Sequence, residues 1–345
     1  MTQLMGQLPA PRVIASSRAF LHCGVDYAGP MDTRASGGRG IKTRKSYVSL
    51  FVCLATRAIH LELVCDYTSA AFLNAYGRFC SRRGLPSDIY SDNGTTFQGA
   101  ERELKQAYAQ AISDPNVLSY VASQSTQWHF IPPHAPHFGG LWEAGVKSVK
   151  HHLRRVLGAH TLTYEEFSTV LCRVEACLNS RPIAPLSDAP DSLEVLTPGH
   201  FLIGAPLTSP PEPSLLALQE NRLSRWQLLR QLIERFWKLW QDDYLNTLNQ
   251  RKKWTKPQPQ IKPGQLVVIQ NPMLPPCKWE LGRITRCHTG SDGLTRVVSV
   301  KTASSEYKRP IAKLCLLPVE IEPSSNQPTS DFHRARSNLA TSKLS

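Results

Sequence analysis

The order of strand and helix patterns between residues 20 and 182 constrains the fold more than any other feature of this sequence. Three short runs rich in β-branched and aromatic residues come first, and the brief turn between the second and third predicts antiparallel pairing. Helical patterns then alternate with two further strand patterns, which together predict a mixed α/β sheet. The expected strands are 20–29, 46–54, 58–64, 87–92 and 126–132, and the expected helices are 69–82, a helix after Gln98, 141–157 and 163–181.

Capping signals support two of these helices. Thr68 or Ser69 is suited to begin the first, and Gly84 is suited to end it. The helix at Thr163 starts with Thr-x-x-Glu, the spacing of a capping box.

The second half of the chain has a different composition. A stretch rich in Pro, Ser and Leu predicts a linker, and residues 222–250 then form an amphipathic helical pattern. Short β-rich runs with glycine turns follow, which indicates a small barrel. The predicted plan is a lead-in at 1–19, a core at 20–182, a linker at 183–221, a basic helix and barrel at 222–318, and a disordered tail at 319–345.

Charge is concentrated in the helix-and-barrel segment. The chain carries +13, and residues 221–318 hold 18 Lys and Arg against 6 Asp and Glu, which leaves 18 − 6 = +12 there. This concentration favours a polyanionic partner, most simply nucleic acid, over a merely solubilising surface. The nine cysteines form no C-x-x-C pair, which is typical of reduced thiols in the cytosol or nucleus. The sequence shows neither an apolar signal core nor an 18-residue apolar stretch.

Three carboxylates occupy positions where chemistry is plausible. Asp26 lies in an apolar strand pattern, Asp92 at a strand end before a turn, and Glu143 near a helix start. A buried acid is costly unless it is paired or bound to metal, although backbone amides alone could satisfy Asp26. Converging acids can hold two divalent ions for in-line phosphoryl displacement, which needs no protein nucleophile. Neither a G-x-S-x-G motif nor a Cys–His signature is evident.

The helix that carries Glu143 has a cationic stripe. Lys147, Lys150 and Arg154 follow the acid at helical spacing, and a neighbouring apolar stripe should face the core. A solvated face is the usual reason for such a stripe, but beside a metal site these cations could grip a nucleic-acid backbone. We expect His134 and His137 to lie in a loop that helps to hold DNA, and His151 and His152 to lie on an exposed helix surface. Trp237 and Trp240 should have packing roles. Trp254 could stack on bases.

Five strings in order carry a family resemblance: "VDYAGP", "YVSLFVCLATRAIHLELV", "SDNGTTFQGA", "HFGGLWEAGVKSVK" and "LNSRPI". Together they resemble the integrase of LTR retrotransposons, within the retroviral integrase superfamily, and are closest to the Pao/BEL group. The resemblance implies an RNase H-like core at 20–182 and a small SH3-like β-barrel after the basic helix. It also implies that Asp26, Asp92 and Glu143 are the catalytic metal ligands.

The same resemblance implies a function and its partners. The chain would be a polynucleotidyl transferase that uses Mg²⁺, or Mn²⁺ in its place, to trim retroelement DNA ends and join them to target DNA in the nucleus, after a cytoplasmic phase. It would act as a homo-multimer, and no membrane partner is expected. The family's upstream zinc module is not in this sequence. The alternative is an inactive or co-opted DNA-binding or assembly protein. The expected DNA-binding residues are Lys147, Lys150, Arg154, Arg251, Lys252, Lys253 and Lys256.

Overall fold

The computed structural model describes residues 18–36, 42–92, 94–112, 126–130, 140–158, 160–187, 189, 191–249 and 261–317, with only the backbone described at 105–112, 140–144 and 146. The expected mixed α/β sheet is confirmed. Its strands are ordered β3-β2-β1-β4-β5, and a short β6 pairs with β1. Their bounds are β1 His22–Arg34, β2 Thr43–Cys53, β3 Ile59–Val64, β4 Asp88–Ser91, β5 Gln127–Phe130 and β6 Leu162–Thr163.

Pairing in this sheet changes direction at β1. β1 pairs antiparallel with β2, and β2 pairs antiparallel with β3 as their brief turn predicts, whereas β4 is parallel to both β1 and β5. The end of β4 therefore lies beside the middle of the long strand β1. Asp92 directly follows this end.

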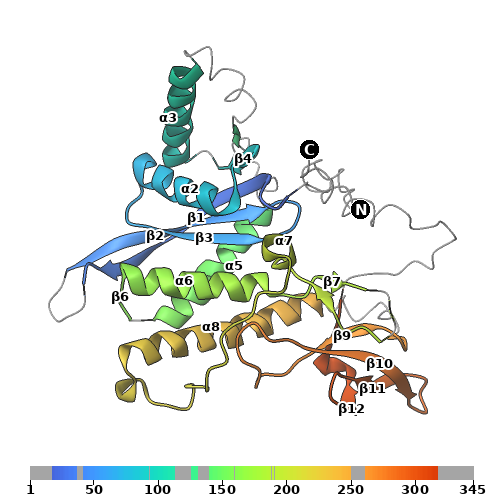
Figure 1. Cartoon of the computed structure of the whole chain (residues 1–345). Coiled ribbons are helices and arrows are strands. Elements are labelled where there is room, and N and C mark those ends of the chain that lie inside the picture. The colour runs from blue at the N-terminus through green and yellow to red at the C-terminus, as the bar shows by residue number, and fades with distance from the viewer. Residues whose placement is uncertain are drawn as a thin grey trace, which may run out of the picture.

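Helices cover both faces of the sheet (Figure 1). Phe51 and Val25 point into an apolar cluster with α2 and α3, whereas Leu50 and Ala28 point into a second cluster with α5, α6 and α8. The alternation along each strand separates these two cores. The helices are α2 Ser69–Arg83, α3 Thr95–Ile112, α5 Gly140–Leu157, α6 Tyr164–Asn179 and α8 Arg225–Leu248.

Helix starts follow the capping signals, with one correction. Thr68 caps α2, and Thr163 forms both hydrogen bonds of the expected capping box with Glu166. However, α3 begins at Thr95 rather than after Gln98. The amides of Phe97 and Gln98 already donate to the carbonyl of Gly94, so the first turn forms before the apolar period starts at Leu104.

The outer edge of β3 is covered by side chains instead of another strand. Asn179 donates to the Ile59 carbonyl at 2.7 Å and accepts from the Ile59 amide at 2.8 Å. The Leu61 amide donates to Glu175 at 2.8 Å. An uncovered edge would be open to pairing with another chain, so α6 seals the sheet here. The Leu63 carbonyl is covered in the same way by Tyr164 and Arg78.

The C-terminal region is a five-stranded antiparallel sheet ordered β12-β11-β10-β9-β13, compatible with the expected SH3-like barrel. It is attached to the core through the "LNSRPI" string: Trp279 donates to the Ser180 hydroxyl at 3.2 Å, and Tyr244 of α8 donates to the Pro182 carbonyl at 2.5 Å. Among the described residues, no helix is long and apolar enough to cross a membrane. The strands are β9 Leu266–Ile269, β10 Glu280–Thr289, β11 Thr295–Lys301, β12 Glu306–Pro310 and β13 Leu314–Leu316.

The segment expected to be a linker contains short elements of its own. These are β7 Ala184–Pro185, β8 Val195–Leu196, α7 His200–Ile203 and the 3₁₀ turn Glu220–Arg222, with a further 3₁₀ turn at Ile311–Lys313 between β12 and β13. β7 and β8 pair with each other.

Candidate active site

The register between β1 and β4, continued two residues past its last pair, brings Asp26 level with Asp92. The parallel pairs are His22 with Asp88, Cys23 with Ile89 and Gly24 with Tyr90, each 66 residues apart, as in 88 − 22 = 66. Asp26 and Asp92 have the same separation, 92 − 26 = 66, two residues further along both chains. Neighbouring strands lie roughly 4.8 Å apart, so the same register continued to these residues keeps their backbones close together.

Backbone amides orient both carboxylates. Asp26 Oδ1 accepts from the amide of Tyr27 at 2.6 Å, and Asp92 Oδ1 accepts from the amide of Gly94 at 3.0 Å. Asp26 is half-buried and Asp92 is exposed, so solvent and a ligand can reach the pair. A Cβ on Gly94 would lie 3.0 Å from Asp92 Oδ1, which explains why this turn suits glycine.

Helix α5 brings the backbone of Glu143 to the same part of the sheet. A Cβ placed on Gly145 would lie 3.6 Å from Val52 and 3.8 Å from Leu50, and Leu50 is the residue opposite Asp26 in β2. This part of α5 therefore packs over β2, next to the strand β1 that carries Asp26. The side chain of Glu143 lies outside the described residues.

Tyr67 was not predicted from the sequence, yet it adjoins both acids. Burial, and then the negative charges of Asp92 and Asp26, raise the pKa of the Tyr67 phenol. A Cβ on Gly94 would lie 3.5 Å from its hydroxyl. Tyr67 directly precedes the helix cap Thr68. Its position between a strand and a helix is the sequence signal that could have indicated a residue of the site.

The two described acids suit a hard divalent cation. Mg²⁺ and Mn²⁺ prefer oxygen ligands, and the carboxylates of Asp26 and Asp92 supply them. Each carboxylate is already oriented by a backbone amide. Asp26 and Asp92 therefore fit the metal that the sequence resemblance implies.

The cations of α5 lie at the surface as expected. Lys147 and Arg154 are exposed and Lys150 is half-buried, while Val149 and Leu153 are each 1% exposed in the core. The expectation for His152 was wrong: it is 1% exposed, because it packs against Phe236 of α8. His134 and His137 lie outside the described residues.

The C-terminal cations divide into two kinds. Arg286 and Lys308 are exposed and flank Ser299 on adjacent strands, which makes a cationic row across β10, β11 and β12. Arg283 instead donates to the carbonyls of Gly264 and Ser192, at 2.6 and 2.7 Å, and so holds the linker.

Several predicted DNA-contacting residues have no described structure, while the tryptophan expectations are partly confirmed. Trp237 and Trp240 are 2% and 5% exposed, as expected for packing residues. The residues outside the described part are Arg251, Lys252, Lys253, Trp254 and Lys256.

Comparisons with known proteins give one family match and weak structural neighbours. Residues 224–317, from the start of α8 to the end of the C-terminal sheet, match a family described as a family of unknown function, DUF5641. No curated protein matches the chain.

Among solved structures, the chain is similar to the cryoEM structure of the simian T-cell lymphotropic virus intasome in complex with PP2A regulatory subunit B56 gamma. The identity is 12% and the TM-score 0.36, over 93% of this chain and 86% of that one. The HTLV-2 integrase catalytic core domain in complex with magnesium is similar in its dimeric form, with 14% identity and a TM-score of 0.29 over 47% of this chain and 88% of that one. The trimeric form of the same domain has 15% identity and a TM-score of 0.31, over 55% of this chain and 99% of that one. These structural similarities are too weak to assign a function, so a function has to be inferred from the residues of this chain.

Proposed function

We propose that this chain is an integrase-type polynucleotidyl transferase that cuts and joins DNA at a carboxylate metal site. The observation that carries the proposal is the placement of Asp26 in β1 beside the end of the parallel strand β4, which Asp92 directly follows, with the charges of both acids acting on Tyr67. The motifs around both residues and around Glu143, which lies on a helix packed over the same strands, support the same assignment.

The residues have distinct roles in this proposal. Asp26 and Asp92 hold divalent metal, and Glu143 completes the ligand set. Bound Mg²⁺ supplies charge stabilisation for the attacking and leaving oxygens of an in-line displacement at phosphorus. Lys147 and Lys150 follow on the same helix, where they can position the DNA phosphates beside the acids.

The amide hydrogen bonds of the two aspartates serve this role. They fix the direction of each carboxylate before any ligand arrives, so less rotational freedom is lost on binding. Water attacks in the trimming step and a DNA 3′-hydroxyl attacks in the joining step, so the protein supplies no nucleophile. The proposal extends to a retrotransposon origin in the Pao/BEL group, a nuclear site of action and a multimeric active form.

A joining assay tests the proposal. The full chain is incubated with Mg²⁺ or Mn²⁺, a supercoiled plasmid and blunt duplexes whose ends carry mixed sequences, and joined products are amplified. The assay is repeated with a family zinc module fused upstream. Wild type should join DNA, and Asp92→Asn should lose at least a hundredfold because an amide is a poor ligand for a hard cation.

Glu103→Gln is the matched control, because Glu103 is an exposed acid on α3. It should join DNA as wild type does. Joining by Asp92→Asn at near wild-type levels would refute the mechanism. DNA binding by wild type without joining in either metal would favour a binding-only protein.

A further inference from the structure

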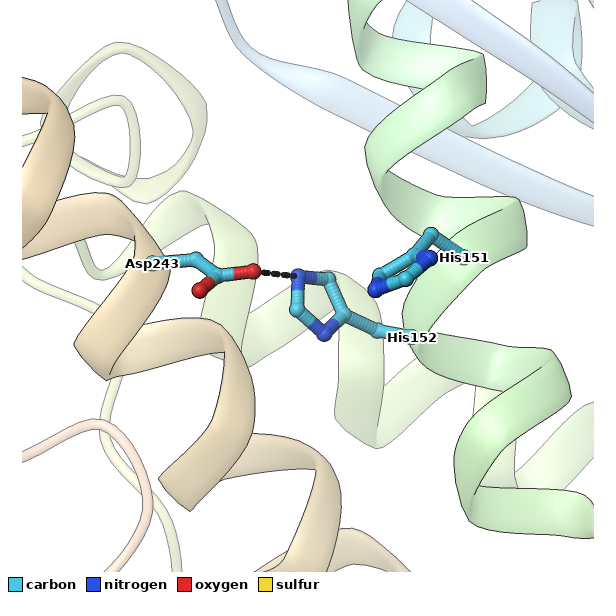
Figure 2. Close-up of side chains that lie close together, drawn as sticks. All are labelled: His151, His152 and Asp243. Atoms are coloured by element: carbon cyan, nitrogen blue, oxygen red, sulfur yellow. Dashed lines mark ion pairs between the residues drawn. The ribbon is translucent and has the colours of Figure 1, made fainter.

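A second group of metal-ligating side chains lies away from the carboxylate pair. His151 and His152 of α5 and Asp243 of α8 have donor atoms that all lie within 4.8 Å of one another. Figure 2 shows the His152 ring between Asp243 and His151, where the two helices face each other. We propose that these three residues bind a transition-metal ion of the zinc class.

One pair of these donor atoms already has a spacing that an ion could share. His152 Nε2 lies 3.2 Å from Asp243 Oδ2, where the two side chains form an ion pair. Two ligands of a tetrahedral Zn²⁺ at about 2.0–2.1 Å lie roughly 3.3 Å apart, so this pair is already spaced for a shared ion. His151 and Asp243 are exposed side chains, so both can rotate to close the remaining distance.

The chemistry of the donors selects the metal. Two imidazoles and one carboxylate suit Zn²⁺ and its neighbours, whereas Mg²⁺ prefers oxygen ligands alone. The exposed side of the cluster, where Asp243 is 56% exposed, leaves room for water as a fourth ligand.

Two features limit the affinity. When an ion occupies Nε2, the ring proton of His152 must sit on Nδ1, which is buried and has no hydrogen-bond partner in the described part of the chain. A partner at that position is typically worth roughly tenfold to a hundredfold in affinity, so binding should be correspondingly weak. Arg155 Nη1 lies 3.5 Å from His151 Nε2, and its charge opposes a cation.

Such an ion would join two functional elements. α5 carries Lys147, Lys150 and the backbone of Glu143, while α8 leads toward the C-terminal sheet. Occupancy would therefore stabilise the contact between the core and the C-terminal region.

Calorimetric titration of the full chain with Zn²⁺, in excess Mg²⁺ to fill hard sites, tests the proposal. The two test variants are Asp243→Asn and His151→Gln. Both native side chains are exposed, so their replacement should not disturb the fold. Each should weaken one zinc event by about tenfold or more. Arg155→Gln should tighten the same event, and Asp242→Asn, the neighbouring acid, should leave it unchanged.

Thermal unfolding gives an independent reading. Zn²⁺ should raise the melting temperature of wild type and of Asp242→Asn, and raise it less in Asp243→Asn. The proposal is overturned if Asp243→Asn and His151→Gln bind Zn²⁺ as wild type does, or if wild type, Asp242→Asn and Asp243→Asn all show the same thermal shift. Neither result depends on catalytic activity.

Discussion

Replacing Asn179 tests how the edge of the sheet is closed. This side chain is fully buried and makes both hydrogen bonds to Ile59, one to the amide and one to the carbonyl. Asn179→Ala removes both, and it leaves two backbone groups of a buried edge strand without partners.

The magnitude follows from those two groups. An unpaired buried donor or acceptor costs about 1–3 kcal/mol, so losing partners for two groups should lower the free energy of unfolding of Asn179→Ala by about 2–6 kcal/mol. Asn179→Asp keeps the acceptor for the Ile59 amide but cannot donate to the carbonyl, and it buries a carboxylate. It should therefore be at least as destabilising as alanine.

Urea unfolding and native-state hydrogen exchange measure the effect. The Ile59 amide should be protected in wild type and exchange much faster in Asn179→Ala. Asn246→Ala is the control, because Asn246 is exposed on α8 and its loss should change stability by no more than about 0.5 kcal/mol. If Asn179→Ala matches that control and the Ile59 amide stays protected, the side-chain cap does not stabilise this edge.

Two further predictions concern charged residues. The hydrogen bond from Arg225 holds the pKa of Glu166 at about 2. After allowance for solvent screening, Glu166→Gln should lower the free energy of unfolding at pH 7 by about 1–2 kcal/mol. Glu165→Gln, at an exposed neighbouring acid, should leave it unchanged. Because this pKa is depressed, the stabilisation is complete above the ordinary value of 4.5 and fades toward pH 2, so urea midpoints of the two proteins should converge there. For the cationic row, replacing Arg286 and Lys308 with alanine should reduce the slope of log affinity against log salt for duplex DNA by about 1.8, and an unchanged slope would mean that they do not contact phosphates.

The sequence predicted the features that depend on local pattern and strand order. Asp26 and Asp92 have the same separation as the paired residues His22 and Asp88, and the sequence was enough to place Asp26 within a strand and Asp92 at the end of one. The capping box at Thr163 was likewise readable, because all of its partners lie within four residues.

Features set by distant partners could not be predicted in this way. His152 looked exposed because its own helix shows a polar neighbour, but Phe236 and Asp243 of α8 bury it. Charge counting likewise could not show which cations are already paired within the chain. Arg225 binds Glu166 and Arg283 binds linker carbonyls, so part of the basic excess serves the fold.

Direct metal binding at the carboxylate pair tests the central claim most closely, because it requires neither DNA nor a particular multimer. Mn²⁺ binding is measured by electron paramagnetic resonance on the full chain in an Asp243→Asn background, which removes the proposed zinc site. If Asp26 and Asp92 share an ion, adding Asp92→Asn should weaken the tightest Mn²⁺ event at least tenfold, while Glu103→Gln should leave it unchanged. Equal Mn²⁺ affinity in the Asp92→Asn and Glu103→Gln proteins would contradict the account.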